Sequence, residues 1–464
     1  MTSDAIPAIS LSIAEFTSRF SYDDLPQRLR EFARYHALDT VGTSLAATKT
    51  DFARSAYEGL APLAEGGACS VIGMSAKLGL RDAVLLNGIL AHGLDYDDTH
   101  TPSQMHPSAS AFPCALGLAE FQNKSGCELL MAYVLGAEIS IRTAIASANT
   151  MQSTGFHSTG VIGHFGCAIA ASKLYELNAA QTCMAQGLAG STASALGEYR
   201  SDGSWNKRMH PGWAAVGGIT AASLARGGYV GSKKIYEGRD GVFRTHAGPN
   251  FEAVKLDAML DGLGSEWRFE GAAIKPLPVC HFLHACADSV LALRREHNLD
   301  PDDILEAQAL LPKDAFRVVC EPVDMRRRPA SENVAQFSAQ FVVAACLVRG
   351  KLTFAELSPE SLADERILAI AQRVTYDECP GSLYPRYHSG GATLKTKDGR
   401  TLTHVEPINR GNGERALSND EIVAKFMENA QLAVSHDVAE RMRDRVLDIE
   451  RISAREFARA VSMR

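Results

Sequence analysis

At 464 residues, the chain is long enough for two or three domains. Its composition is that of an ordinary globular protein, with 46% hydrophobic residues, 22% charged residues and a formal net charge of −7 at pH 7. This balance excludes a broad basic surface for nucleic acid, because phosphate backbones are bound by clustered lysine and arginine. The one basic cluster, Arg326–Arg328, is short and ends at Pro329, so we expect a solvated turn there.

The ten cysteines include no C-x-x-C pair, which disfavours a structural zinc site or an iron–sulfur cluster. The N-terminal segment has no Lys or Arg before Arg19 and is a poor signal peptide. The longest apolar run, Leu129–Ala137, is far shorter than the roughly 18 residues of a membrane span. We therefore expect a reduced, cytoplasmic protein with neither a membrane nor a nucleic-acid partner. Four cysteines lie in apolar segments, where a thiol acts as a small hydrophobic group: Cys114, Cys167, Cys183 and Cys346.

The first half of the chain predicts helices almost throughout. After a short tail, Leu25–Ala47 keeps its apolar residues on one stripe, with Pro26 in its first turn. Ser125 and Glu128 form a capping box that opens a long helix to Ala146. We also predict a weak strand over Ser70–Gly73 and helices over Asp51–Leu63, Leu80–Leu94, Ser108–Glu120, Val161–Leu177, Asn178–Ala195 and Pro211–Arg226.

Strand and helix signals begin to mix near Trp267. The pair Asp398-Gly399 separates two short strand-like segments, and such a pair favours a hairpin because these turns need positive φ. A capping box at Ser418 returns the chain to helix. We predict strands over Arg268–Ala273, Ile304–Leu311, Ala392–Lys397 and Thr401–Glu406, and helices over His281–Glu296 and Ala335–Arg349.

These elements predict a mainly α protein. A large all-helical domain spans residues 1–268, and a smaller α+β domain spans residues 269–411. A helical segment over residues 412–464 then returns to the first domain. No repeat of 20–50 residues is evident, which disfavours a solenoid.

The stretch His92–His106, HGLDYDDTHTPSQMH, is the densest in titratable groups. It holds three histidines and the aspartates Asp95, Asp97 and Asp98, yet apolar segments flank it on both sides. Buried charges are costly unless they are paired, so acids and bases in such a setting favour a catalytic cleft. The alternative is a polar loop with its acids in water.

Four other places could carry chemistry. His157 lies between glycines in GFHSTG, and Lys207 and His210 lie in the turn-rich DGSWNKRMHPGW. Lys275 lies in AAIKPLP, where an ammonium among apolar neighbours needs an anionic partner. His281 precedes His284 by three positions, which places both on one helix face. A histidine on a helix face is more often a satisfied core residue, and Lys207 could equally be solvated.

A divalent metal is the rival use of these residues. His92 with Asp95, or His100 with His106, could ligate an ion. No HExxH or comparable motif supports this reading, so we predict no metal site.

Taken together, HGLDYDDTH, His106-Pro107-Ser108, GFHSTG, SWNKRMHPGWAA and IKPLPVC resemble the MmgE/PrpD family. The resemblance extends from about Leu25 to Asn429, with the motifs in the family's order. That family includes 2-methylcitrate dehydratase, cis-aconitate decarboxylase and iminodisuccinate epimerase. The resemblance implies a large helical domain, a smaller α+β lid domain, a homodimer, and no metal or organic cofactor.

The resemblance also assigns roles. It implies that His106 and His157 move the proton, that Asp95 orients one imidazole, and that Lys207 offsets charge on an enediolate-like transition state. By resemblance, Thr99 and Lys275 would contact substrate carboxylates. We add His210 and His281 as candidate substrate-binding residues on their positions in the sequence alone. His100 stands where some members carry a tryptophan after the DDT, and this loop should line the pocket.

The function we expect first is a cofactor-independent lyase acting on a small di- or tricarboxylate. Proton abstraction next to a carboxylate and loss of the β-hydroxyl would dehydrate a 2-methylcitrate-like 2-hydroxy acid. The alternatives are a cis-aconitate-type decarboxylase and an iminodisuccinate-type epimerase. A non-catalytic, carboxylate-binding dimer remains a further alternative.

Overall fold

The computed structural model describes residues 8–64 and 66–463. Helices account for 61% of it and strands for 9%, as expected for a mainly α protein. The described residues form two compact units. Unit 1 runs up to Ala272 and resumes at Ser418, and unit 2 comprises Ala273–Leu417. The first seven residues of the predicted tail lie outside the described residues.

Unit 1 is an assembly of helices. Its α6 (Gly126–Ser147) opens with the predicted capping box, in which the Glu128 carboxylate accepts a hydrogen bond from the Ser125 amide at 2.8 Å. Among the described helices, α6 alone has the length and apolar character of a membrane span, but 94% of its apolar window is buried inside the protein. The helices that precede unit 2 are α1 (Ile9–Arg19), α2 (Gln27–Ala47), α3 (Asp51–Leu60), α4 (Leu80–His92), α5 (Ser108–Gln122), α6, α7 (Thr150–Ser153), α8 (Ser158–Leu174), α9 (Ala179–Ala189), α10 (Tyr199–Asp202), α11 (Asn206–Arg226) and α12 (Val242–Ala247).

Small residues let α4, α8 and α11 approach closely. A Cβ at Gly88 would lie 2.3 Å from Cα of Gly212, and one at Gly212 would lie 2.3 Å from the carbonyl oxygen of Leu85. Both glycines are therefore required by the backbone-to-backbone contact of α4 with α11. This contact brings the end of α4 next to the first turns of α11.

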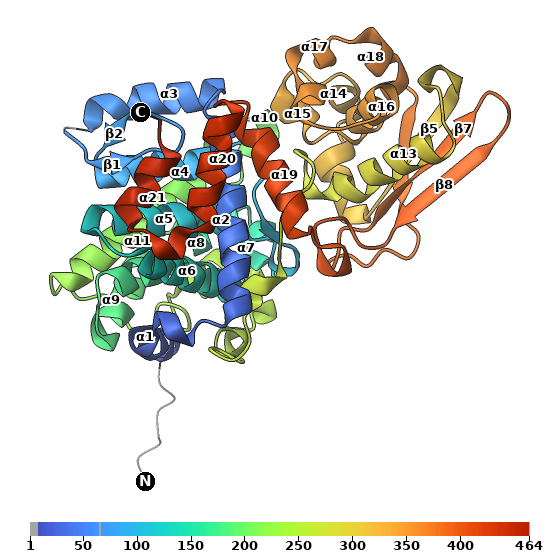
Figure 1. Cartoon of the computed structure of the whole chain (residues 1–464). Coiled ribbons are helices and arrows are strands. Elements are labelled where there is room, and N and C mark those ends of the chain that lie inside the picture. Colours follow the sequence, from blue (N-terminus) through green and yellow to red (C-terminus); the bar gives the residue numbers. More distant parts are fainter. Residues whose placement is uncertain (1–7, 65, 464) are drawn as a thin grey trace. The chain divides into compact units, whose positions relative to one another are not determined.

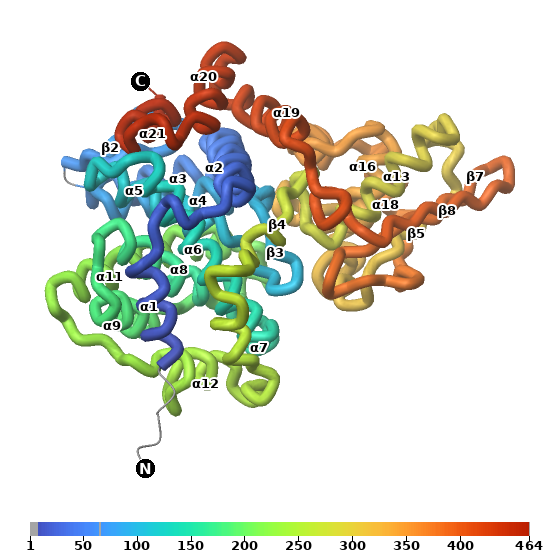
Figure 2. Tube along the Cα trace, turned by 60° about the horizontal axis from the view of Figure 1, so that its bottom comes forward, coloured from blue at the N-terminus to red at the C-terminus, as the bar shows by residue number. Residues whose placement is uncertain are grey.

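The last helices return to unit 1. They are α19 (Asn419–Ala430), α20 (His436–Leu447) and α21 (Ala454–Val461). Figures 1 and 2 show α19 in red beside the blue α2. Phe426 is fully buried against Gly42, where a Cβ would lie only 2.9 Å from the Phe426 ring. The predicted return of the chain is therefore a packed contact between α19 and α2.

Several predicted elements of unit 1 differ from the structure. The predicted helix Asn178–Ala195 ends at Ala189. Helix α1 forms within the segment expected to be a tail. Helix α11 begins at Asn206 and continues through Pro211, so it starts earlier than predicted. The predicted strand Arg268–Ala273 is wrong for most of its length, because Arg268–Gly271 is a 3₁₀ turn and only β4 (Ala272–Ala273) is extended. Short strands β1 (Cys69–Ser70) and β2 (Lys77–Leu78) pair near α5, and β3 (Thr99–His100) follows α4.

Unit 2 is built on a four-stranded sheet in the order β6-β5-β7-β8. Strand β5 pairs in parallel with β6 and antiparallel with β7, and Gly399 at φ +87° closes the predicted β7–β8 hairpin. Helix α13 packs on the sheet (Figure 1). The strands are β5 (Ile304–Leu311), β6 (Val374–Glu378), β7 (Gly390–Thr396) and β8 (Thr401–Glu406); the helices are α13 (His284–Glu296), α14 (Val323–Arg327), α15 (Glu332–Ala335), α16 (Ala339–Arg349), α17 (Pro359–Leu362) and α18 (Glu365–Ala371).

Candidate active site

The candidate active site of unit 1 is organised by the loop that follows α4, Gly93–Asp98, which we call the site loop. Asp95 adopts the left-handed region at φ +52°, a conformation that aspartate tolerates better than most residues. The three aspartates of the site loop are all buried. Each carboxylate therefore needs a positive or hydrogen-bonding partner.

Asp97 joins two histidines. Its Oδ2 atom lies 2.8 Å from Nδ1 of His92 and 3.2 Å from Nδ1 of His106. Burial alone would raise the pKa of Asp97, but the two imidazoles and their hydrogen bonds hold it well below its ordinary value. Because a carboxylate only accepts, each imidazole carries its hydrogen on Nδ1 and leaves Nε2 as the basic nitrogen. Thr99 Oγ1 also lies 3.3 Å from Nδ1 of His106.

His92 stands between His106 and His157. Its ring centroid is 4.9 Å from that of His106 and 5.5 Å from that of His157, on which it stacks. Burial lowers the pKa of His92 to about 4 despite the attraction of Asp97. Within residues 8–64 and 66–463, Nε2 of His92 is buried and has no hydrogen-bond partner. A neutral, partly unsatisfied imidazole thus lies at the centre of the group.

His157 and His210 form a second pair. Their Nδ1 atoms are 3.0 Å apart, so one donates the hydrogen and the other accepts it. Burial, followed by the charges of neighbouring groups, holds the pKa of His157 well below its ordinary value, and burial lowers that of His210 to about 4. Both imidazoles are therefore neutral near pH 7. The ring of Tyr199 lies beside both.

Lys207 forms an ion pair with Asp95. Burial would lower the pKa of this ammonium, but Asp95 and Tyr199 outweigh it and the pKa is raised. The side chain keeps 17% of its surface exposed, and that of Asp95 keeps 8%. Lys207 is therefore a fixed positive charge that solvent can reach.

Of the predicted site residues, six lie in this group: Asp95, Thr99, His106, His157, Lys207 and His210. The carboxylate in contact with the imidazoles of His92 and His106 is Asp97, whereas the sequence hypothesis gave this role to Asp95. The sequence patterns gave no role to Tyr199, and they indicated His92 only as a metal ligand. The signal for Asp97 was its position five residues after a histidine that ends a helix.

The other two predicted residues, Lys275 and His281, belong to unit 2. Lys275 is 1% exposed, and Nε2 of His281 lies 2.8 Å from the amide nitrogen of Asn409, which donates to it. His388 stacks on His281 with ring centroids 4.6 Å apart. Burial and the charge of Lys275 lower the pKa of His388 to about 3. Unit 2 therefore holds a stacked pair of imidazoles, of which His388 is neutral near pH 7, together with a buried ammonium.

Three residues of unit 1 lie close enough together to hold a metal ion. One ligand atom each from His92, Asp97 and His106 lies within 4.8 Å of the other two. However, Nδ1 of both imidazoles is already within hydrogen-bond range of the Asp97 carboxylate, so a metal at these nitrogens would have to displace both hydrogens. A metal at the two Nε2 atoms would leave Asp97 as the partner that orients the rings instead of a ligand. The donor set therefore fits a hydrogen-bonded triad better than a metal centre.

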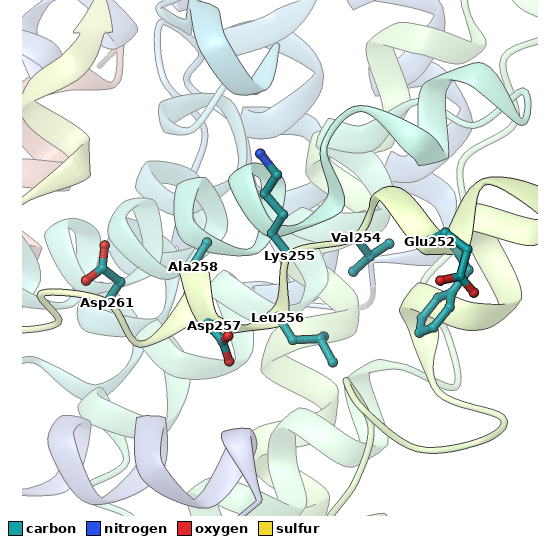
Figure 3. A pocket seen from close by; sticks show the side chains of 8 residues that line it. Glu252, Val254, Lys255, Leu256, Asp257, Ala258 and Asp261 are labelled. Carbon is teal, nitrogen blue, oxygen red and sulfur yellow. The ribbon is translucent and has the colours of Figure 1, made fainter.

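A surface hollow of about 690 Å³ lies elsewhere in unit 1, along the segment Phe251–Asp261. Figure 3 shows its side chains arranged along this single segment. Glu252, Lys255 and Asp257 in its lining are exposed, and it contains no histidine. It has none of the buried acid–base groups described above.

Two family models match the chain. The MmgE/PrpD N-terminal domain matches residues 11–253, and the MmgE/PrpD C-terminal domain matches residues 277–451. The chain is 26% identical to a cis-aconitate decarboxylase-like protein of Aspergillus oryzae, covering 95% of this chain and 94% of the relative. It is 27% identical to the cis-aconitate decarboxylase of Homo sapiens, covering 96% and 92%, and 24% identical to that of Aspergillus terreus, covering 97% and 95%.

Proposed function

Because the chain belongs to the MmgE/PrpD family, we propose that it is a lyase that removes CO₂ from a small unsaturated tricarboxylate of the cis-aconitate type. The observation that carries this proposal is the Asp97–His106 pair beside the Lys207 ammonium, in a chain whose relatives named as decarboxylases match it over almost their whole length.

The proposed reaction sets three requirements. The bond between carbon and one carboxylate breaks, and CO₂ leaves. The electron pair left behind is delocalised through the double bond towards a remaining carboxylate. A proton then adds to carbon, and the charge that develops in between must be stabilised. The enzyme therefore needs a cation for the carboxylates and an acid for the carbon.

The residues of unit 1 have these properties. The Lys207 ammonium would bind a substrate carboxylate and stabilise the developing negative charge. The protonated form of His106 would donate its proton from Nε2, while Asp97 stabilises the imidazolium through Nδ1. His157, being neutral, would donate or accept a hydrogen bond at the substrate.

In place of the imidazole role expected from the sequence, we propose that Asp95 orients Lys207. Thr99 keeps its expected role of binding a substrate carboxylate, and we propose that it also orients His106. The family resemblance further assigns Lys275 to carboxylate binding, and we propose the same role for His281. The burial of Lys275 is consistent with an ammonium that meets an anion.

Dehydration of a 2-methylcitrate-like acid was our first expectation from sequence, and the named relatives favour decarboxylation instead. Both reactions move one proton next to a carboxylate, so the same groups could serve either. Their products differ, because dehydration releases water and decarboxylation releases CO₂.

The test is an NMR assay in D₂O with cis-aconitate, citrate, 2-methylcitrate and iminodisuccinate in parallel. We expect cis-aconitate to be consumed with release of CO₂ and incorporation of one deuterium into the product. Loss of water from 2-methylcitrate would replace this proposal with a dehydratase, and exchange without loss of a group would indicate an epimerase. Stabilisation by these acids in a thermal-shift assay, without turnover of any, would indicate a carboxylate-binding protein.

We also propose that the protein is a homodimer, as the family resemblance implies. Trp205, Met209 and Trp213 lie four residues apart at the start of α11 and are 46%, 42% and 45% exposed. Residues at this spacing share one helix face, so they form an apolar stripe in water. A second copy of the chain is the partner that we propose for this stripe.

A further inference from the structure

We propose that Lys425, from the helical segment after unit 2, is a positioning residue that holds the site loop so that Asp97 faces the histidines. The inference rests on the proposed function for its kinetic test. The contacts described below join Lys425 to Tyr96 of the site loop and to Asp39.

Three contacts fix the ammonium of Lys425. Its Nζ atom donates to the carbonyl oxygen of Tyr96 at 2.9 Å and lies 3.7 Å from the centre of the Tyr96 ring. It also lies 2.6 Å from Oδ1 of Asp39, on α2. Lys425 is 6% exposed and Asp39 is 2% exposed. The site loop is therefore bound to α2 and α19 through one buried cation.

Stability alone is a poor reason for this arrangement. Removing two charges from water costs free energy that their mutual attraction often fails to recover, and apolar residues of similar size are frequently as stable. A buried ion pair can instead select one geometry. Here, the geometry that it selects is that of the backbone between Asp95 and Asp97.

A second anchor lies two residues further along the loop. Oδ2 of Asp98 accepts hydrogen bonds from Nδ1 of His36 at 2.8 Å and from Oγ of Ser108 at 2.5 Å. The backbone amide of Ser108 donates to Oδ1 of Asp98 at 3.2 Å. Tyr96 and Asp98 are thus held by α2, α5 and α19. Asp95, which precedes Tyr96, pairs with Lys207, and Asp97, which lies between Tyr96 and Asp98, contacts His92 and His106.

Because the anchored residues Tyr96 and Asp98 lie on either side of Asp97, the anchors restrict the position of its carboxylate. The loop residues on either side of Asp97 are both fixed, so its carboxylate has little freedom to move away from His92 and His106. A displacement of about 1 Å at a reacting group can lower the rate on the order of a hundredfold. The contact of Tyr96 with Lys425 therefore bears on the geometry of the proposed proton donor.

The position of Lys425 depends in turn on its neighbour Phe426. Phe426 packs against Gly42 of α2, and this contact sets the depth at which α19 lies on unit 1. The C-terminal family model extends to residue 451 and so includes α19, although α19 belongs to unit 1. The segment after unit 2 thus supplies a group that acts on the site of unit 1.

The experiment compares Lys425→Met, which keeps the length of the side chain without its charge, with Lys425→Arg and Arg142→Met. Arg142 is a matched control because it is also buried and pairs with a carboxylate, that of Glu138, at 2.6 Å. It donates to the carbonyls of Asp261 and Glu266 and not to the site loop. The readouts are kcat, KM, the pH profile of kcat, the Tm, and hydrogen–deuterium exchange of peptides covering the site loop.

We expect Lys425→Met to lower kcat on the order of ten- to a hundredfold, with a smaller change in KM and an altered pH profile. Exchange of the site loop should be faster in this variant and near wild type in Arg142→Met, even where both have a lower Tm. Lys425→Arg should restore part of kcat. Equal kcat per folded enzyme in Lys425→Met and wild type, or equal loop exchange in both methionine variants, would overturn the proposal.

The two proposals can fail separately. If wild-type protein converts none of the four acids, the proposed function fails, and the exchange comparison still decides whether Lys425 holds the loop. If Lys425→Met does not fold, Asp39→Asn provides the second variant, because it removes the anion that fixes the Lys425 ammonium against the Tyr96 carbonyl. We expect Asp39→Asn to change kcat and loop exchange in the same direction, and no change in either would overturn the proposal.

Discussion

Oδ2 of Asp97 lies 3.2 Å from Nδ1 of His106, and this contact decides which nitrogen of that imidazole is basic. The same oxygen lies 2.8 Å from Nδ1 of His92, so one carboxylate sets the tautomer of two rings. An aspartate in this position orients an imidazole and stabilises its protonated form.

Asp97→Asn should therefore lower kcat on the order of 10² or more, with a much smaller effect on KM. The amide keeps the shape of the side chain but loses the charge that stabilises an imidazolium. Asp82→Asn, on the first turn of α4, is the control and should remain near wild type. Normal turnover in Asp97→Asn would show that neither imidazole needs this partner.

Lys207→Ala and His157→Ala should each lower the rate on the order of 10² or more while the fold stays intact. Lys207→Ala removes the cation that is proposed to bind a carboxylate, so its KM should rise as well. Lys234→Ala, at an exposed position, serves as the control. Steady-state kinetics together with circular dichroism check this, and near-normal activity in both site variants would exclude the assigned roles.

Stability should fall as the pH is lowered from about 6.5 towards 4. Burial lowers the pKa of His164 to about 4, so in this window the unfolded chain binds a proton that the folded protein does not. The stabilisation is complete above the unfolded pKa and is lost as the pH falls towards the folded one. The buried carboxyl groups of Asp39, Glu138 and Asp288 have raised pKa values and act in the opposite direction.

Comparison of variants isolates the histidine contribution. His164→Gln cannot titrate, so its free energy of unfolding should decline less than that of wild type between pH 7 and pH 4.5, by about 1–3 kcal/mol. His436→Gln, at a side chain that is 60% exposed, should follow wild type. Urea denaturation at several pH values measures these slopes, and parallel curves for His164→Gln and wild type would refute the argument.

Metal removal should leave activity unchanged. His92, Asp97 and His106 come close enough to hold an ion, but their atoms already bond to one another. Protein dialysed against EDTA and then assayed with cis-aconitate tests this. If chelation abolished turnover and a single divalent ion restored it, the triad would have to be reassigned as a metal centre.

The apolar stripe on α11 should control association. Replacing both Trp205 and Trp213 with serine removes most of its aromatic surface, and we expect a shift towards monomer in light scattering at micromolar concentration. Leu63→Ser, at an exposed position outside this stripe, is the matched control. A dimer of unchanged stability in the double variant would place the interface elsewhere.

Local sequence signals predicted those elements whose structure is set locally. Strand β5 and the Asp398-Gly399 hairpin follow from short-range pattern and turn chemistry, and the capping boxes at Ser125 and Ser418 formed as predicted. Arg268–Gly271 did not form a strand because the carboxylate of Glu138, far away in sequence, accepts the backbone hydrogens of Arg268 and Phe269. No local pattern contains that contact.

The candidate site also depends on contacts that local sequence patterns do not contain. The dense stretch His92–His106 predicted the position of an active site, and the family resemblance indicated which residues belong to it. Neither could show which aspartate faces which partner, because the left-handed turn at Asp95 and the anchors on Tyr96 and Asp98 are tertiary features. The role of Asp97 could therefore be identified only from the tertiary structure.

The contact of α19 with α2 also constrains how the protein is made. Unit 1 is split in the chain, and its Gly42 surface stays uncovered until Phe426 has been synthesised. Unit 2 is one continuous segment of the chain, so it can fold on the ribosome before the last helices of unit 1 have been synthesised. The part of unit 1 that precedes unit 2 is therefore synthesised before the helix that covers this surface of α2.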